Sequence, residues 1–212
     1  MTKIKNFRVH FRPREMARWL KKERGVEIIT PELELAIDEV AKEAKKWVIP
    51  AAVYTTLTRQ TAEKTTTIPW PPEAVALSVA AVSIGPALEA ERKSAAADAT
   101  REMLLAALLQ EALAQSLQFT IRLIGEQAKE EDCEMSLPVS VQDLPAGRQG
   151  LLSSLATLLD LARIGIAIDA AAPELPSYAR VSYLFWTPVS KGPASAKAPA
   201  GKSAGSAEKV AA

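Results

Sequence analysis

Cysteine, histidine and aromatic residues are scarce in this chain of 212 residues. It contains one cysteine, Cys133, and one histidine, His10, and its aromatic fraction is 5%. A single cysteine excludes an intramolecular disulfide, and one Cys with one His cannot by themselves form a Cys/His zinc site. Acidic residues flank Cys133 in the sequence. We therefore expect a raised thiol pKa and an inert thiol on the surface or in a loop.

Long apolar runs and an excess of one charge are also missing. No uninterrupted apolar run approaches the roughly 18 residues that span a bilayer, and the N-terminus lacks the apolar core of a secretory signal. The net charge of +1 gives no global argument for binding to nucleic acid or membranes. We therefore expect a cytoplasmic protein with no membrane contact, and nucleic acid is not an expected partner.

The sequence lacks the common catalytic signatures. It has no GxSxG elbow, no phosphate-binding loop, no HExxH and no dinucleotide-binding glycine triplet. His10 is far in sequence from any carboxylate cluster, and the acidic run Glu126–Glu134 lacks the alternating ligand order of a calcium loop. We predict no catalytic residues and no metal site, and we do not expect independent catalytic activity.

The N-terminal segment is strongly basic. Residues 1–24 hold nine Lys and Arg against two Glu, which is typical of an arm that binds an acidic partner. The alternative is an amphipathic helix, with Met16, Trp19 and Leu20 packed inward and the basic side chains in water. Gly25 is suited to end such a helix as a C-cap. We treat residues 1–29 as a basic N-terminal arm or helix.

The rest of the chain predicts one α+β domain over residues 30–189, followed by a disordered Ala/Ser/Gly/Pro/Lys tail over residues 190–212. The apolar fraction of 48% and the charged fraction of 24% over all 212 residues are typical of a globular protein. We expect a twisted, mainly antiparallel sheet with packed helices, including one long central helix. The periodicity and the turn residues predict these elements: a helix over Glu32–Val48, a hairpin of Val53–Thr58 with Thr65–Ile68, a buried strand within Ala76–Ile84, a helix over Ala99–Lys129, a helix over Leu151–Leu161, and strands over Ile164–Ile168 and Arg180–Val189.

Four ordered segments in the second half resemble a known family. They are Glu111–Arg122 (EALAQSLQFTIR), Leu137–Pro145 (LPVSVQDLP), Leu158–Asp169 (LLDLARIGIAID) and Ala179–Pro188 (ARVSYLFWTP). Their order resembles the reactivation domain of cobalamin-dependent methionine synthase, which binds S-adenosylmethionine and helps to re-methylate an oxidised cobalamin. The resemblance spans roughly residues 30–188, and it implies the reactivation-domain fold.

The resemblance also implies where a ligand would bind. The family's long helix carries Glu-Ala-x-Ala-Glu-x-x-His-x-x-x-Arg, and Glu111 keeps the first position of this pattern. The family's ligand loop carries an Arg and a Gly-Tyr pair, but here Leu137 is at the Arg position and no Gly-Tyr pair is present. In the last strand Tyr183 replaces a Gly, and Phe185 replaces a Tyr. The cofactor-binding positions that the resemblance implies are Glu111, Pro138, Ser140, Tyr183 and Phe185.

These departures predict a degraded S-adenosylmethionine site, because a Leu cannot replace the bidentate contact of an Arg with a carboxylate. The resemblance implies an accessory protein for a corrinoid protein or a cobalamin-dependent methyltransferase, with cobalamin held by that partner. Two alternatives remain open. One is an S-adenosylmethionine-binding reactivation protein with a rearranged site. The other is a non-enzymatic interaction module that keeps only the fold.

Overall fold

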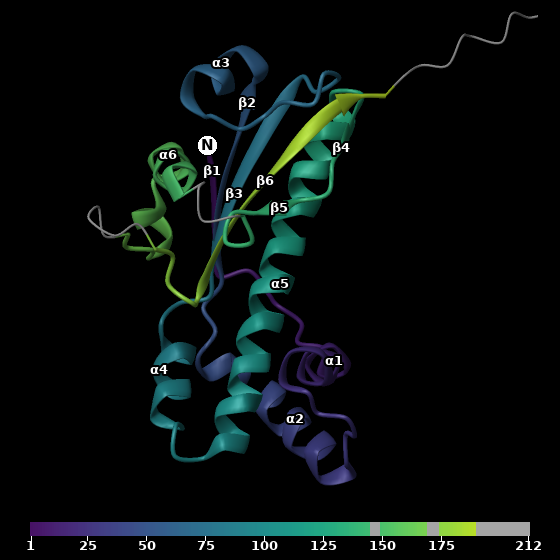
Figure 1. Ribbon diagram of the computed structural model, residues 1–212, viewed down its shortest axis with the longest axis vertical. Helices are drawn as coiled ribbons and strands as arrows, with labels where there is room; N and C mark the ends of the chain where they lie inside the picture. Colours follow the sequence, from purple (N-terminus) through teal and green to yellow (C-terminus); the bar gives the residue numbers. More distant parts are fainter. Residues whose placement is uncertain (145–148, 169–173, 190–212) are drawn as a thin grey trace, which may run out of the picture.

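One long helix, α5 (Ala99–Glu130), runs along the whole molecule (Figure 1). The structure is a computed structural model, and it describes residues 1–144, 149–168 and 174–189. The predicted tail over residues 190–212 lies outside the described residues. The other helices and strands, in chain order, are β1 (Thr2–Lys5), α1 (Pro13–Arg24), α2 (Pro31–Glu43), the 3-10 helix η1 (Ala44–Lys46), β2 (Ala51–Thr58), α3 (Arg59–Thr65), β3 (Ala76–Ser83), α4 (Ala87–Ser94), β4 (Cys133–Met135), β5 (Val139–Ser140), α6 (Gln149–Leu159), the 3-10 helix η3 (Leu161–Ile164) and β6 (Ala179–Pro188).

The described strands form one antiparallel sheet in the order β1-β2-β3-β6-β4, and β5 also pairs with β6. The three long strands β2, β3 and β6 lie side by side, with Ala51 opposite Ser83 and Ala76 opposite Trp186. The last of the described strands, β6, is therefore in the interior of the sheet. The prediction of an α+β fold with a mainly antiparallel sheet and one long central helix is confirmed.

Side chains alternate between the two faces of the sheet, and each face covers its own core. On one face Val181, Tyr183 and Phe185 pack with α6 and η3. On the other face Leu184 and Trp186 pack against the C-terminal half of α5. The indole Nε1 of Trp186 donates a hydrogen bond of 2.9 Å to Ser78 Oγ, so this buried polar atom is satisfied.

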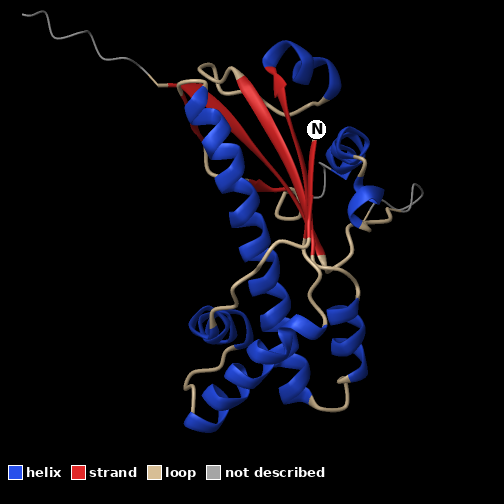
Figure 2. Ribbon diagram, turned by 180° about the vertical axis from the view of Figure 1, so that it is seen from behind, coloured by secondary structure: helices blue, strands red, loops and turns tan. Residues whose placement is uncertain are grey.

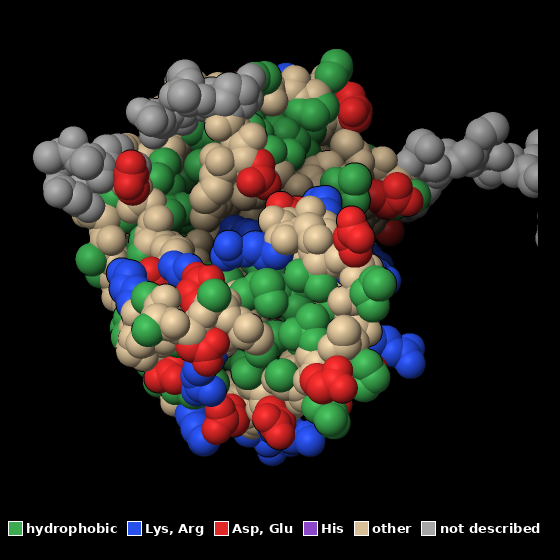
Figure 3. Space-filling model, turned by 60° about the horizontal axis from the view of Figure 1, so that its bottom comes forward, with side chains coloured by type: hydrophobic (Ala, Val, Ile, Leu, Met, Phe, Trp, Pro, Cys, Tyr) green, Lys and Arg blue, Asp and Glu red, His purple; other side chains and the backbone are tan. Residues whose placement is uncertain are grey.

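The N-terminal half of α5 extends beyond the sheet, where α1, α2 and α4 pack around it (Figure 2). Seen from this helical end, apolar side chains gather in the middle of the surface, and charged side chains surround them (Figure 3). Helix α5 is long and apolar enough to cross a membrane by length and composition alone. However, 67% of its most apolar stretch is buried inside the structure, as in the core helix of a domain.

Helix ends follow the local sequence rules. Thr30 Oγ1 accepts a hydrogen bond from the Leu33 amide at the start of α2, and Asp98 Oδ1 accepts one from the Arg101 amide at the start of α5. Gly25 ends α1 with a left-handed φ of 66°, a conformation that glycine adopts without steric cost. The C-cap at Gly25 was predicted from the sequence.

The basic N-terminal segment packs on the rest of the protein. Strand β1 pairs with β2, and Met16 and Leu20 of α1 are fully buried among residues of α2 and α5. The amphipathic-helix interpretation of this segment is confirmed, and most basic side chains of α1 face solvent. Residues 2–5 were not predicted to form a strand, because four residues that include two lysines are too few to show an alternation of apolar and polar side chains.

Two predicted elements are wrong, and a third is shorter than predicted. The predicted hairpin is absent, since residues 59–65 form α3, where Arg59 and Glu63 pair at helical spacing, and β2 pairs instead with β1 and β3. The strand predicted over residues 164–168 is also absent, because Leu161–Ile164 form a 3-10 helix and Gly165 turns the chain with a φ of 74°. The apolar residues that suggested a strand, Leu161, Ile164 and Ile166, are instead buried in the core beneath the sheet. The helix predicted over residues 32–48 ends at Glu43 and continues as the short 3-10 helix η1.

A carboxylate in α4 makes the stability of the fold sensitive to acid. Glu89 is 13% exposed, and it accepts hydrogen bonds from Ser177, Lys93 and Arg92. Burial is the largest single effect and raises its pKa, but the three donors together outweigh burial, so the pKa of Glu89 is lowered. A lowered pKa in the folded state stabilises the protein above the unfolded value of about 4.3, and this stabilisation is lost as the pH falls through the folded pKa.

Glu89→Gln is therefore expected to destabilise the protein by about 1–2 kcal/mol at pH 7, the scale of a hydrogen-bonded charge. The difference from the unsubstituted protein should shrink between about pH 5 and pH 3. Urea denaturation at a series of pH values measures both quantities. Glu39→Gln, at an exposed position of α2, is the matched control and should change neither. If the loss of stability in Glu89→Gln stays constant down to pH 3, Glu89 does not have a lowered pKa in the folded protein.

Candidate functional site

The structure does not bring the five predicted site residues together. Glu111 lies on α5, against one face of the sheet, whereas Tyr183 and Phe185 lie in the core on the opposite face. Pro138 is exposed, and Ser140 is half-buried in β5. The sheet itself therefore separates Glu111 from the two aromatic residues.

Glu111 lines a groove of about 590 Å³ between α1, α5 and the start of β6. Each wall comes from a different part of the chain: α1 and the residue before it, the middle of α5, the turn after β5, and β6. The lining residues are Arg12, Glu15, Arg18, Trp19, Lys22, Glu23, Ala107, Gln110, Glu111, Ala114, Asp143 and Arg180. Four of these carry a positive charge and four a negative charge, so the groove is polar and nearly neutral.

The central interaction in this groove is the ion pair between Arg12 and Glu111. Arg12 Nε donates a hydrogen bond of 2.8 Å to Glu111 Oε1, and Nη2 lies 3.5 Å from Oε2. Glu111 is 5% exposed and Arg12 46% exposed, so the carboxylate is buried beneath its partner. The hydrogen bond with Glu111 raises the pKa of the Arg12 guanidinium. Sequence reasoning found Glu111 but missed Arg12, which precedes it by 99 residues.

Most other charges of the groove are also paired within the chain. Arg18 donates to both carboxylate oxygens of Glu15, at 2.9 and 2.8 Å. Lys22 Nζ lies 3.1 Å from Glu23 Oε1. These exposed pairs contribute little to stability individually, about 0–1 kcal/mol, but they reduce the charge that the groove can offer to a ligand.

Arg180 and Asp143 differ from the other charged residues of the groove. Arg180 Nη2 donates a hydrogen bond of 3.0 Å to the neutral Gln110 Oε1. Within the described residues neither Arg180 nor Asp143 forms an ion pair. Arg180 belongs to β6 and Asp143 to the turn after β5. Neither residue was predicted as a site residue, because nothing in the sequence places them beside Glu111.

The segment from Ser136 to Gln142 is held by the last strand. The Phe185 amide donates to Ser136 Oγ at 3.0 Å, and Gln142 Nε2 donates to the carbonyl of Ala179 at 3.1 Å. Ser140 Oγ donates to Gln142 Oε1 at 3.1 Å. Leu137, which the sequence comparison predicted at the position of the family's Arg, is 86% exposed, so its side chain does not fill the groove.

Tyr183 and Phe185 form part of an aromatic cluster in the sheet core. Their rings lie 5.9 Å apart at 81°, and the Phe185 ring meets Trp70 edge-on at 5.1 Å. Both side chains are less than 10% exposed. Edge-to-face pairs of this kind stabilise a core by about 0.5–1.5 kcal/mol beyond the area they bury. The geometry gives these two residues a packing role, on the face of the sheet away from the groove.

Cys133 is buried in β4, at 7% exposure, whereas a surface or loop thiol was expected. Burial is the main reason that its thiol pKa is raised, and the charges of Glu131 and Asp132 add to the effect. The expected direction of the shift is confirmed, but its largest cause is burial rather than the acidic neighbours. Across residues 1–144, 149–168 and 174–189, no group of three or more His, Cys, Asp or Glu side chains is arranged to hold a metal ion.

The fold is α+β, with an antiparallel sheet, a long helix across it and a polar groove beside that helix. A solved structure titled "Crystal Structure of the MetH Reactivation Domain bound to AdoHcy" has the same fold, with a TM-score of 0.59 over 91% of this chain and 80% of that chain. The identity is 12%, so the similarity establishes the fold alone. No protein-family model and no curated protein matches the sequence.

Proposed function

We propose that this protein is an accessory protein of a corrinoid-dependent methyltransferase system, with a degraded S-adenosylmethionine site. The observation that carries the proposal is the fold, which resembles a reactivation domain whose structure contains AdoHcy. The resemblance implies a domain that presents a methyl donor to a cobalt centre outside the domain itself. Positioning requires no acid, base or nucleophile of the domain itself, which fits a chain without catalytic signatures.

Two features of the groove and its surroundings support the proposal that the S-adenosylmethionine site is degraded. The Glu111 carboxylate already accepts a hydrogen bond of 2.8 Å from Arg12 Nε, which belongs to the protein's own N-terminal segment. A ligand that used Glu111 would have to displace this part-buried hydrogen bond, which costs about 1.5–3 kcal/mol for a bond to a charged group. In the corresponding loop Leu137 points to solvent and supplies no charge.

A second candidate function is retained S-adenosylmethionine binding through a rearranged site. The observation in its favour is that Arg180 and Asp143 line the same groove without an ion pair among the described residues. An arginine and an aspartate together match the carboxylate and the ammonium of an amino-acid zwitterion. S-adenosylmethionine and S-adenosylhomocysteine both carry such a group.

Calorimetric titration with S-adenosylmethionine and S-adenosylhomocysteine separates the two functions. We expect no binding tighter than about 100 µM, which corresponds to about −5.5 kcal/mol. Tighter binding that is lost in Arg180→Gln would favour the rearranged site and contradict the degraded one. Lys22→Gln is the matched control, because it removes one positive charge from the rim of the same groove.

Association with a corrinoid protein tests the partner directly. The full chain should bind a corrinoid-carrying methyltransferase in a pull-down, and the association should depend on whether cobalamin is loaded. No association with either form would overturn the proposal and favour an interaction module that keeps only the fold. In that case neutral replacements of exposed basic residues on α1 would test whether this helix is the contact surface.

A further inference from the structure

A second pocket lies on the other side of α1, between α1 and α2, and has a volume of about 370 Å³. Small-molecule sites in proteins have volumes of about 300–1,000 Å³. The pocket is independent of the groove around Glu111, and of its lining only Arg18 is shared with that groove. The lining residues are Pro13, Arg14, Ala17, Arg18, Lys21, Ile29, Glu34 and Ile37.

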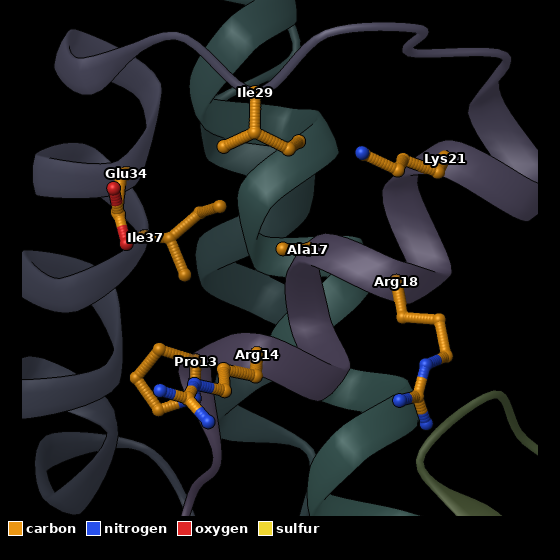
Figure 4. Close-up of a pocket in the computed structure, with 8 residues that line it drawn as sticks. All are labelled: Pro13, Arg14, Ala17, Arg18, Lys21, Ile29, Glu34 and Ile37. Carbon is orange, nitrogen blue, oxygen red and sulfur yellow. The ribbon is translucent and has the colours of Figure 1, made fainter.

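The floor of this pocket is apolar. Ala17 comes from α1, Ile37 from α2, and Ile29 from the segment that joins the two helices (Figure 4). Ile37 is almost fully buried at 1% exposure, whereas Ala17 and Ile29 are half-buried and pack against the same core. An apolar body of a few carbon atoms would therefore find partners on both helices and on the connecting segment.

The rim of the pocket is cationic. Lys21 extends its ammonium over the pocket towards Ile29 and Ala17, while Arg18 directs its guanidinium away from the floor, where Glu15 neutralises it (Figure 4). Arg14 and Lys21 form no ion pair or side-chain hydrogen bond with any described residue. Glu34 is the one acidic group of the lining. The charges that are not neutralised thus sum to about +1 above an apolar floor.

We propose that this pocket binds a small amphipathic carboxylate, with its apolar body on Ala17, Ile29 and Ile37 and its carboxylate at the Lys21 ammonium. The Arg14 guanidinium, at the opposite end of the pocket beside Pro13, adds positive charge to the rim (Figure 4). The apolar floor selects the body, and the two cations select an anion over a neutral molecule of the same shape. Glu34 opposes the anion, so it lowers the affinity. This site is separate from the proposed function, because it lies outside the groove that contains Glu111.

Octanoate is the probe, and the methyl resonances of Ile29 and Ile37 are the readout in the full-length protein. These resonances should shift and saturate with added octanoate. Each CH₂ added between hexanoate and octanoate should raise the affinity by up to about fourfold if it is buried. Octan-1-ol, which has the same body without the charge, should bind at least tenfold more weakly.

Variants separate the charges of the rim. The double variant Arg14→Gln/Lys21→Gln should bind octanoate at least tenfold more weakly, whereas Lys22→Gln, one position along α1, should bind it as the unsubstituted protein does. Glu34→Gln should bind it about two- to threefold more tightly. These positions are exposed, so circular dichroism should show an unchanged fold.

Three results would overturn the proposal. The first is the absence of saturable shifts at Ile29 and Ile37, and the second is equal affinity for octanoate and octan-1-ol. The third is weaker binding of octanoate by Glu34→Gln, because removal of the opposing negative charge should strengthen the binding of an anion in this pocket. None of these results bears on the titration with S-adenosylmethionine, so the two proposals fail independently.

Discussion

Deletion of residues 1–24 is expected to abolish cooperative folding. The deletion removes β1 from the edge of the sheet and takes Met16 and Leu20, both fully buried, out of the core around α5. Truncation of one such side chain costs about 2–5 kcal/mol. Loss of both, together with the exposure of the surface they covered, approaches the 5–15 kcal/mol that stabilises a typical domain.

Urea denaturation, followed by far-ultraviolet circular dichroism, measures this effect. The single variants Met16→Ala and Leu20→Ala should each lower the free energy of unfolding by about 2–5 kcal/mol. Arg14→Gln, on the exposed side of the same helix, is the matched control and should change it by less than about 0.5 kcal/mol. A truncated chain that unfolds with an unchanged midpoint would show that the segment is a detachable arm. Partner-binding experiments should therefore use point variants in α1 rather than its deletion.

Arg12→Met is expected to lower the free energy of unfolding by about 2–3 kcal/mol. The substitution leaves the Glu111 carboxylate, 5% exposed, without its cation. Breaking a fully buried ion pair costs about 3–5 kcal/mol. The expected loss is smaller here because Arg12 is 46% exposed, so water can reach the vacated carboxylate.

A double-mutant cycle isolates this interaction. The variant Arg12→Met/Glu111→Met should be more stable than Arg12→Met alone, since no buried charge then lacks a partner. Arg18→Met removes the neighbouring exposed pair with Glu15 and should cost less than about 1 kcal/mol. If Arg12→Met and Arg18→Met lower the free energy of unfolding equally, the ion pair with Glu111 contributes no more to stability than the exposed pair with Glu15.

Local features of the fold could be predicted from the sequence, because their causes lie within a few residues. Thr30, Asp98 and Gly25 cap helices through contacts that span at most six residues. The long helix and the two central strands β3 and β6 also followed from composition and periodicity. The hairpin prediction was wrong because the sequence after β2 is compatible with either a strand or a short helix. Both edges of β2 are paired, with β1 and with β3, so no edge is left for a hairpin partner.

The candidate site was much less predictable, because it depends on contacts between distant segments. Glu111 was found through the resemblance, but its partner Arg12 lies 99 positions away. Alternation along β6 places Tyr183 and Phe185 on one face and Arg180 on the other. Which of these faces meets α5 is decided by the packing of the whole sheet, and so the residue of β6 that reaches the groove, Arg180, was missed.

The position of β6 has a consequence for synthesis of the protein. This strand is made after all the other described elements, yet it pairs with β3 about 100 residues earlier and holds both β4 and β5. Until Pro188 has left the ribosome, β3 presents an unpaired edge, and Trp186 cannot close the core against α5. Exposed strand edges favour aggregation of nascent chains. Ribosome-bound chains that end before β6 should therefore depend on chaperones, while the N-terminal helices can already pack on α5.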